Sequence, residues 1–160
     1  MTYRRLTNDE LSELETAFAR FLAVNGIPAD DWVKIKAEDY KRTEELIESF
    51  SDVVFHETLS KVEYLDFKTK KEIRTFHCSK EKIILRGITV EGETALDFTE
   101  DEDSKLMLTK MQASGAKLSI YVTEKKYKDD KREMELFTMM ESGCLISDGS
   151  LFKLLESITK

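Results

Sequence analysis

The sequence predicts an α+β fold in which N-terminal helices pack on a small, mainly antiparallel sheet, with further helices toward the C-terminus. Apolar residues recur at helical spacing through the first 65 residues. Two later segments, "EIRTFHCS" and "KIILRGITV", are rich in β-branched and aromatic residues. No linker rich in Gly, Ser or Pro divides the 160 residues, so we expect one domain over 1–160, helical over 1–65 and mixed over 66–160.

The first helix has signals at both of its ends. Thr7 followed three residues later by Glu10 forms a capping box, in which each side chain hydrogen-bonds a free backbone N–H of the first turn. Asn25 and Gly26 supply the usual helix stop. The sequence therefore predicts a helix over about 8 to 25.

Two more helices are expected before the pattern changes. After Pro28, "ADDWVKIK" has acidic residues in its first turn, where the helix dipole favours them, and predicts a short helix. The stretch "YKRTEELIESFSDVVFHETLSKVEYL" carries apolar residues at helical spacing and predicts one long helix over 39 to 65.

The middle of the chain predicts a hairpin. The segments at about 73 to 79 and 83 to 90 are joined by a short polar link, so we expect two antiparallel strands. Thr99 and Glu102 repeat the capping-box spacing ahead of "DSKLMLTKMQASG", which predicts a helix.

The last third of the chain predicts one more strand and further helices. "AKLSIYVTE" alternates apolar and polar residues, which is typical of a strand with one apolar face. "REMELFTMMESG" has helical spacing and a Gly stop. The final "CLISDGSLFKLLESIT" fits either a short strand followed by a helix or a helix throughout.

Composition limits the classes of partner. Acidic residues outnumber basic ones by 32 to 25, and the net charge of −7 disfavours nucleic acid, because phosphate binding relies on Lys and Arg. The start "MTYRRLTNDELSELE" lacks the apolar middle of a secretory signal, and no segment approaches the roughly 20 apolar residues that span a bilayer. We expect a soluble cytoplasmic protein without a membrane partner, with another protein as the possible partner and the oligomeric state left open.

Four motifs, in order along the chain, carry a resemblance. They are "YRRLTNDELSELETAFARFLAVNGI", "DDW", "FSDVVFHETLSKVEYL" and "ESGCLISDGSLF". Together they resemble a family of small, uncharacterised bacterial proteins that is known only as a domain of unknown function. The resemblance covers nearly the whole chain and implies a stand-alone bacterial cytoplasmic protein, and it implies nothing about activity, cofactor or partner.

The chain's two histidines and two cysteines are the first candidates for a chemical site. His77 and Cys78 are neighbours on an expected strand, so their side chains should point to opposite faces and share neither a metal ion nor a proton. Neither Cys78 nor Cys144 belongs to a C-x-x-C pair, which is the usual sign of zinc. A pair distant in sequence, such as Cys144 with His56, stays open, and we predict no catalytic residue, metal or cofactor.

A metal-dependent nuclease is the alternative that the element order favours. Restriction-endonuclease-like cores place one acidic residue on a strand and an acidic-x-Lys triplet on the next. Here Glu124 to Lys126 fits the triplet, with Asp97 as its best carboxylate partner, but the triplet follows the third strand, after a helix. Fold order alone is an analogy and assigns no function.

We therefore predict a non-enzymatic module that binds a protein or a small ligand. The alternative is a metal-dependent hydrolase or nuclease with a degenerate or undetected site. The binding hypothesis depends on aromatic and charged residues that the apolar patterns leave off the core and that are of types enriched at interfaces, namely Tyr3, Arg4, Arg5, Tyr121 and Tyr127.

Overall fold

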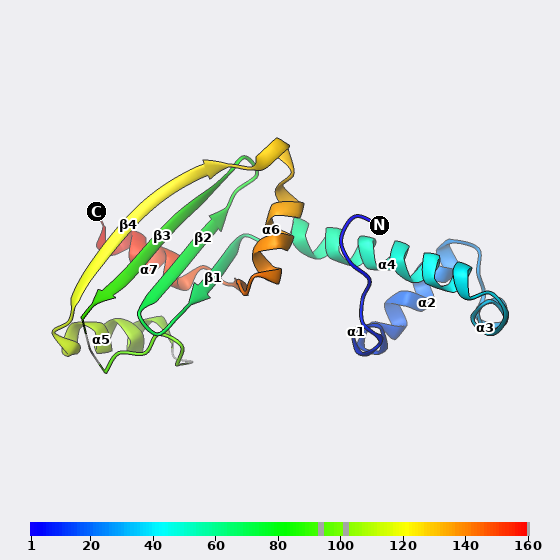
Figure 1. The fold of residues 1–160 in the computed structure, drawn as a ribbon, viewed down its shortest axis with the longest axis horizontal. Helices are drawn as coiled ribbons and strands as arrows, with labels where there is room; N and C mark the ends of the chain where they lie inside the picture. Colours follow the sequence, from blue (N-terminus) through cyan, green and yellow to red (C-terminus); the bar gives the residue numbers. More distant parts are fainter. Residues whose placement is uncertain (93–94, 101–102, 160) are drawn as a thin grey trace. The chain divides into compact units, whose positions relative to one another are not determined.

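The computed structural model describes residues 1–92, 95–100 and 103–159. These residues form seven α-helices and a five-stranded antiparallel sheet, which confirms the α+β prediction (Figure 1). The chain divides into two compact units, the helical unit Met1–Ser60 and the sheet unit Lys61–Lys160, each described by itself. The single domain expected over 1–160 stays a prediction. None of the described helices is long and apolar enough to cross a membrane.

The helical unit confirms the expected helices and corrects one of them. The predicted helix over 8 to 25 is two helices, because the backbone at Leu14 (φ −106°, ψ 21°) leaves helical geometry. The sequence around Leu14 contains no Gly or Pro that would predict this break. The capping box is present, with Thr7 N–H donating to Glu10 Oε1 at 2.8 Å and Glu10 N–H to Thr7 Oγ1 at 3.1 Å. The helices of this unit are α1 (Asn8–Glu13), α2 (Glu15–Val24), α3 (Ala29–Glu38) and α4 (Tyr40–Ser60).

Aromatic rings join the helices of this unit. Phe18 of α2 packs edge-on against Trp32 of α3, with 5.2 Å between ring centroids, and lies 4.9 Å from Phe50 of α4. Trp32 therefore acts as a core anchor between helices, because such edge-to-face pairs add to the burial of the rings.

The predicted helix over 39 to 65 is wrong at its end. Helix α4 stops at Ser60, and Tyr64–Lys68 forms strand β1. The spacing of Leu59, Val62 and Leu65 fits a helix, but "YLDFK" also alternates in the way that a strand requires. Pairing with the next strand decides the outcome, since Leu65 is fully buried where it lies opposite Phe76.

The sheet has the order β4-β3-β2-β1-β5, and all neighbouring strands are antiparallel. The expected hairpin is β2 with β3, in which Cys78 lies opposite Ile83. Within the part of the chain that the structure describes, the two edge strands, β4 and β5, therefore pair on one side only. The strands are β1 (Tyr64–Lys68), β2 (Glu72–Cys78), β3 (Lys82–Glu91), β4 (Lys117–Lys126) and β5 (Leu145–Ser147).

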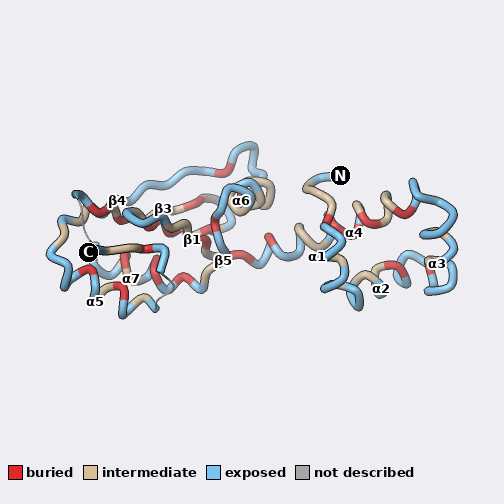
Figure 2. The backbone as a smooth tube through the Cα atoms, turned by 60° about the horizontal axis from the view of Figure 1, so that its bottom comes forward, coloured by how far each residue is buried: buried red, intermediate tan, exposed pale blue. Residues whose placement is uncertain are grey.

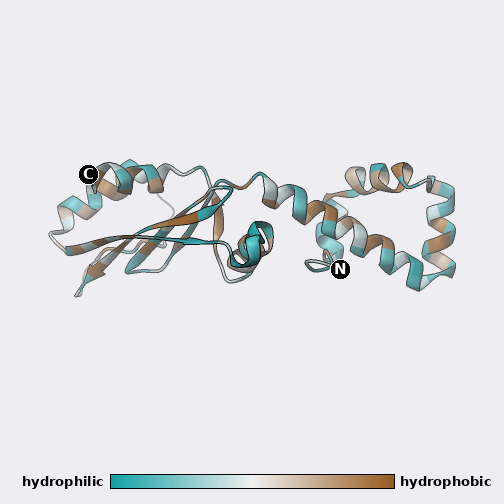
Figure 3. Ribbon diagram, turned by 90° about the horizontal axis from the view of Figure 1, so that it is seen from above, coloured by the Kyte–Doolittle hydropathy of each residue, from teal (hydrophilic) through white to brown (hydrophobic). Residues whose placement is uncertain are grey.

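Helices cover both faces of the sheet unevenly. Seen along the sheet, α5 and α7 lie on one side, called here the α5/α7 face, and α6 lies on the other (Figure 3). The C-terminal segment is a strand followed by a helix, β5 and then α7, which resolves the alternative left by the sequence. The helices are α5 (Ser104–Ser114), α6 (Arg132–Glu141) and α7 (Ser150–Ile158), with a short 3-10 turn, η1 (Lys128–Asp130).

The start of α5 differs from the expectation. The N-cap is Asp103, whose side chain accepts a hydrogen bond from Leu106 N–H at 2.8 Å. Thr99 instead donates to Asp97 through its backbone and its hydroxyl group. Glu102, the other member of the expected capping box, lies outside the described residues.

The main core fills the α5/α7 face, and Figure 2 shows buried positions on the strands, α5 and α7. A smaller core, called here the α6 core, lies on the α6 face and includes the buried residues Cys78 and Leu136. At this core, Arg132 donates to the backbone carbonyls of Ser79 at 3.2 Å and Cys78 at 3.1 Å. The main cluster consists of Ile73, Ile88, Val90, Phe98, Met107, Met111, Leu151 and Leu155.

Candidate functional site

His77 and Cys78 lie on opposite faces of the sheet, as expected for neighbours on a strand. The His77 ring stacks on Tyr64 with 4.9 Å between centroids and lies 5.6 Å from Phe152 of α7. Cys78 is buried in the α6 core, where loss of solvent raises the pKa of its thiol to about 12. His77 is thus an aromatic packing residue and Cys78 a buried apolar one.

Cys144 and His56 complete the four candidates of the sequence. Both thiols are free and buried, and burial also raises the pKa of Cys144. His56 belongs to the helical unit, where Nδ1 lies 3.5 Å from Tyr3 Oη. Within the described residues, no group of three or more His, Cys, Asp or Glu is placed to hold a metal ion.

The two carboxylates of the nuclease alternative lie toward opposite ends of the sheet. Glu124 is opposite Ile84 in β3, which is opposite His77 near the end of β2. Asp97 lies beyond the start of β2, because the next residue, Phe98, donates its N–H to Lys70 O at 3.2 Å. At about 3.3 Å per strand residue, this places them roughly 15 Å or more apart. The structure does not bring them together.

The residues expected at an interface contact their own units. Arg4 pairs with Glu10, and Arg5 pairs with Glu44, at 2.9 and 2.7 Å. Tyr127 is only 5% exposed and donates its hydroxyl hydrogen to Ser79 O at 2.6 Å, so its expected place outside the core is wrong. The charged link around Tyr127 hides this burial from a periodicity argument.

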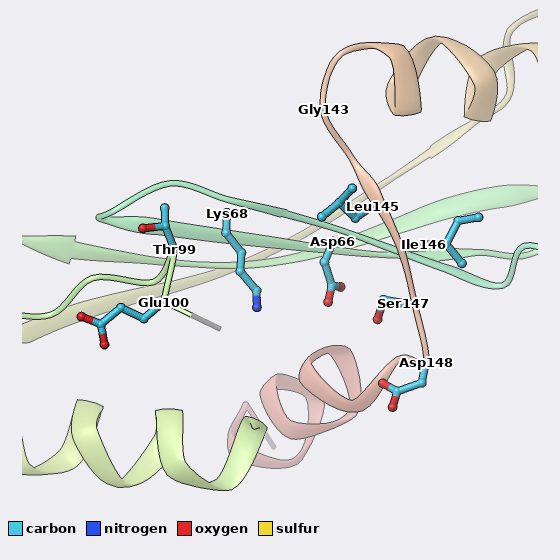
Figure 4. Close-up of a pocket in the computed structure, with 9 residues that line it drawn as sticks. All are labelled: Asp66, Lys68, Thr99, Glu100, Gly143, Leu145, Ile146, Ser147 and Asp148. Carbon is cyan, nitrogen blue, oxygen red and sulfur yellow. The ribbon is translucent and has the colours of Figure 1, made fainter. Parts of the chain in front are cut away.

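A pocket of about 560 Å³ opens beside strand β1 on the α5/α7 face (Figure 4). Its volume falls within the roughly 300–1,000 Å³ of ligand sites. Asp66 and Lys68 project from β1 to the same side, and Ser147 of β5 lies next to Asp66 (Figure 4). We call this cavity the Asp66 pocket; its lining also includes Thr99, Glu100, Gly143, Leu145, Ile146 and Asp148.

Asp66 is the chemically exceptional residue of the pocket. Its Cα lies opposite Thr75 in β2 and opposite Leu145 in β5, so strands flank it on both sides. Its Oδ1 atom is buried, and it has no hydrogen-bond partner in the described part of the chain. A buried carboxylate oxygen without a donor is costly, because it has lost water and gained nothing in exchange.

The electrostatics agree with this geometry. Burial raises the pKa of Asp66 above its ordinary value of 3.8, and the negative charge of Asp148 raises it further. A hydrogen bond from Ser147 and the positive charge of Lys68 act in the opposite direction but do not restore the ordinary value. With Glu100, the described lining of the pocket holds three carboxyl groups against one ammonium group. The site therefore attracts a cation or a strong hydrogen-bond donor.

The turn from β5 to α7 shapes one wall. Gly149 adopts φ +83°, and a Cβ built on it would meet the ring of Tyr64 at 2.6 Å. Only glycine combines this backbone with so close an approach. Asp148 Oδ1 accepts a hydrogen bond from Ser150 N–H at 2.9 Å at the start of α7, which lowers the pKa of Asp148. Asp148 thus stays ionised beside Asp66.

The helical unit has a larger groove, of about 950 Å³, which includes Trp32 and Phe18. Its Arg5 and Glu44 form a salt bridge with each other, and its aromatic rings pack against one another. No buried side-chain nitrogen or oxygen atom of the described helical unit lacks a partner. The Asp66 pocket is therefore the better candidate for a ligand site than this groove.

The fold and the pocket define an α+β protein whose antiparallel sheet carries a polar, ligand-sized cavity at one edge. The sequence model of a family of unknown function, DUF6495, matches residues 1–160, and the chain belongs to this family. This confirms the family resemblance, while the bacterial source that it implies stays a prediction. Comparison with curated proteins and with solved structures gives no match.

Sequence reasoning missed Asp66, Ser147 and Asp148 as site residues. The helix expected over 39 to 65 ends just before Asp66, and no local pattern marks Ser147 or Asp148 as site residues. The available signal was the alternation in "YLDFK": as a strand, it places Asp66 on the face opposite to Leu65, next to a covering helix.

Proposed function

We propose that this protein is a non-enzymatic binding module whose Asp66 pocket binds a small ligand with an ammonium or guanidinium group. The observation that carries the proposal is the buried Oδ1 atom of Asp66, which has no partner among the described residues and lies beside a ligand-sized cavity. An N–H donor from a ligand would supply the missing hydrogen bond. Bonds between a cationic donor and a carboxylate are shorter and about twice as strong as neutral ones.

The surrounding residues support a cationic ligand. Glu100 and Asp148 add negative charge around Asp66, whereas Lys68 is the one basic residue of the lining among the described residues. Leu145 is 72% exposed and offers an apolar surface to the carbon chain of an organic amine. Ser147 and Thr99 contribute hydroxyl groups that hydrogen-bond further polar atoms.

The pKa of Asp66 gives the proposed binding a pH dependence. Burial raises the pKa of this carboxyl group above 3.8, so the free site stays protonated to a higher pH than an exposed aspartate does. A cation binds the ionised form, so binding releases a proton while Asp66 is still protonated. Affinity then increases as the pH rises toward the raised pKa of the free site and becomes constant once Asp66 is fully ionised.

Isothermal titration calorimetry on the full chain tests the proposal. Agmatine and spermidine serve as cationic probes, and succinate serves as the anionic control. We expect the cations to bind and succinate not to bind, with affinity reduced about tenfold or more in Asp66→Asn, since hydrogen bonds to charged groups contribute about 1.5–3 kcal/mol. Glu81→Gln is the matched control, because Glu81 is exposed in the β2–β3 turn and lies outside the pocket. Equal binding by wild type and Asp66→Asn would rule the site out.

The proposed compartment is the cytoplasm. Cys78 and Cys144 are both free thiols, which fits a reducing environment. Fractionation of native cells with an antibody against the chain tests this, and recovery in a membrane or extracellular fraction would contradict it.

A further inference from the structure

Strand β4 is a long edge strand of the sheet. It runs over ten residues, Lys117–Lys126, and within the described chain β3 is its one strand neighbour (Figure 1). Its outer backbone N–H and C=O groups are therefore a template for another strand. Proteins usually protect such an edge by making it short, or by placing charged residues, Pro or a bulge along it.

The middle of β4 lacks this protection. Its charged residues are Lys117 at one end and Glu124, Lys125 and Lys126 at the other, so the stretch 118–123 carries no charge and no Pro. Ile120 is 37% exposed and Val122 is 51% exposed. An uncharged strand edge with exposed β-branched side chains favours strand addition.

The exposed apolar side chains lie in one row. Ile120 is opposite Ile88 of the main core, which places it on the α5/α7 face, and Val122 follows two residues later on the same face. Leu118 begins the row and packs partly against the core. The row therefore continues the apolar core of the sheet outward to its edge.

Self-pairing of β4 matches this row. In an antiparallel pair, residues that lie opposite each other point to the same face of the sheet. When the two strands are copies related by a two-fold axis, the axis must therefore pass at a residue, and each such residue defines one register. When the axis passes at Ile120, this residue meets its own copy and Leu118 meets Val122. Of the two neighbouring registers, the one centred on Tyr121 sets Lys117 against Lys125, and like charges directly opposite are destabilising.

Charge also favours a second copy at the sheet unit. The helical unit has seven basic and thirteen acidic residues, a net charge of −6. The sheet unit has eighteen basic and nineteen acidic residues, a net charge of −1. Two sheet units can therefore approach with little repulsion between their net charges.

We propose that two copies of the chain associate through antiparallel pairing of β4 with β4, centred on Ile120, to form one continuous ten-stranded sheet. This surface is separate from the Asp66 pocket, which lies at the β1–β5 edge. The dimer satisfies the outer backbone groups of β4 and covers the row Leu118, Ile120 and Val122.

Sedimentation equilibrium of the full chain tests the association. We expect a concentration-dependent dimer for the wild type and a monomer for the double variant Ile120→Lys/Val122→Lys. Val33→Lys is the matched control, because Val33 is 65% exposed on α3 of the helical unit, and it should keep the wild-type dimer. A monomeric wild type at every concentration, or a double variant that still dimerises, overturns the proposal.

Crosslinking tests the register and does not depend on the double variant folding. Under oxidation with diamide, Ile120→Cys should form an intermolecular disulfide, because residue 120 lies opposite its own copy, where Cβ atoms are about 4.5–5.5 Å apart. Val122→Cys should not, because residue 122 faces Leu118. The native thiols of Cys78 and Cys144 are buried, and the wild type, treated in the same way, measures any crosslinking that they cause. Crosslinking through residue 122 in preference to residue 120 overturns the proposed register.

Discussion

Two carboxyl groups, one in each unit, meet opposite environments. Glu10 of the helical unit accepts hydrogen bonds from Thr7 N–H and from both terminal nitrogens of Arg4, and these bonds lower its pKa to about 2. Asp66 of the sheet unit is buried with Oδ1 lacking a partner in the described chain, and its pKa is raised. A carboxyl group therefore stabilises the folded helical unit at Glu10 and destabilises the folded sheet unit at Asp66.

The difference shows how a binding site can be separated from a structural contact. A carboxylate such as Glu10, whose donors come from its own chain, has no need of a ligand. In Asp66, which is buried beside a cavity, the Oδ1 atom has no donor among the described residues, and a ligand that provides one stabilises the carboxylate. The comparison can be tested by changing each unit at matched positions.

The largest expected effect comes from two glycines with similar backbone geometry. Gly149 of the sheet unit (φ +83°) lies against the Tyr64 ring, whereas Gly26 of the helical unit (φ +77°) has open space around its Cα. Gly149→Ala should lower the free energy of unfolding by about 3 kcal/mol, since backbone strain and overpacking add. Gly26→Ala should cost about 1 kcal/mol, from strain alone.

Urea unfolding followed by two probes measures both glycine variants. Circular dichroism follows both units, and the fluorescence of Trp32, the only tryptophan of the chain, reports on the helical unit. Equal losses for the two variants would mean that the contact between Gly149 and Tyr64 does not shape the wall of the pocket.

A smaller effect, of opposite sign in the two units, is expected from neutralising the two carboxyl groups. At neutral pH, Asp66→Asn should raise the free energy of unfolding by about 1 kcal/mol, because it removes a buried charge that lacks a full set of donors. Glu10→Gln should lower it by about 0.5 kcal/mol, because glutamine keeps the capping hydrogen bond but loses the charge and one of the two oxygens that accept from Arg4, in a partly exposed pair.

The pH dependence of these two variants follows from the direction of each pKa shift. Glu10 has a lowered pKa, so its contribution is present above its ordinary value of 4.5 and is lost as the pH falls through about 2. Asp66 has a raised pKa, so its penalty is absent below 3.8 and develops as the pH rises through the raised value. Unfolding curves over this acid range should show both differences vanishing at low pH; a gain from Asp66→Asn that persists there would contradict the assignment.

Local patterns predicted much of the fold. The capping box at Thr7 and Glu10 and the alternation in β2, β3 and β4 are decided by neighbours in sequence, and the structure confirms them. Strand β1 was missed because five residues of "YLDFK" fit both periods, and only pairing with β2 and β5 selects the strand.

The candidate site could not be predicted in the same way. Among the described residues, three separate segments form the Asp66 pocket: β1, the residues Thr99 and Glu100, and the segment from Gly143 to Asp148 that includes β5. None of them carries a local signature, since a lone Asp on a strand and a Ser-Asp-Gly turn occur in many chains. What distinguishes Asp66 is the lack of a donor for Oδ1, a property of the assembled sheet that one sequence does not show.

The most direct test of the central claim is a carbon-13 NMR titration of the Asp66 side-chain carboxyl group, with and without agmatine. The free protein should show a pKa above 3.8, and saturating agmatine should lower it, because the cation supplies the donor that Oδ1 lacks. Glu10, titrated in the same spectra, should keep its pKa of about 2 with and without agmatine. A pKa of Asp66 at or below 3.8 in the free protein, or one that agmatine leaves unchanged, would contradict the account.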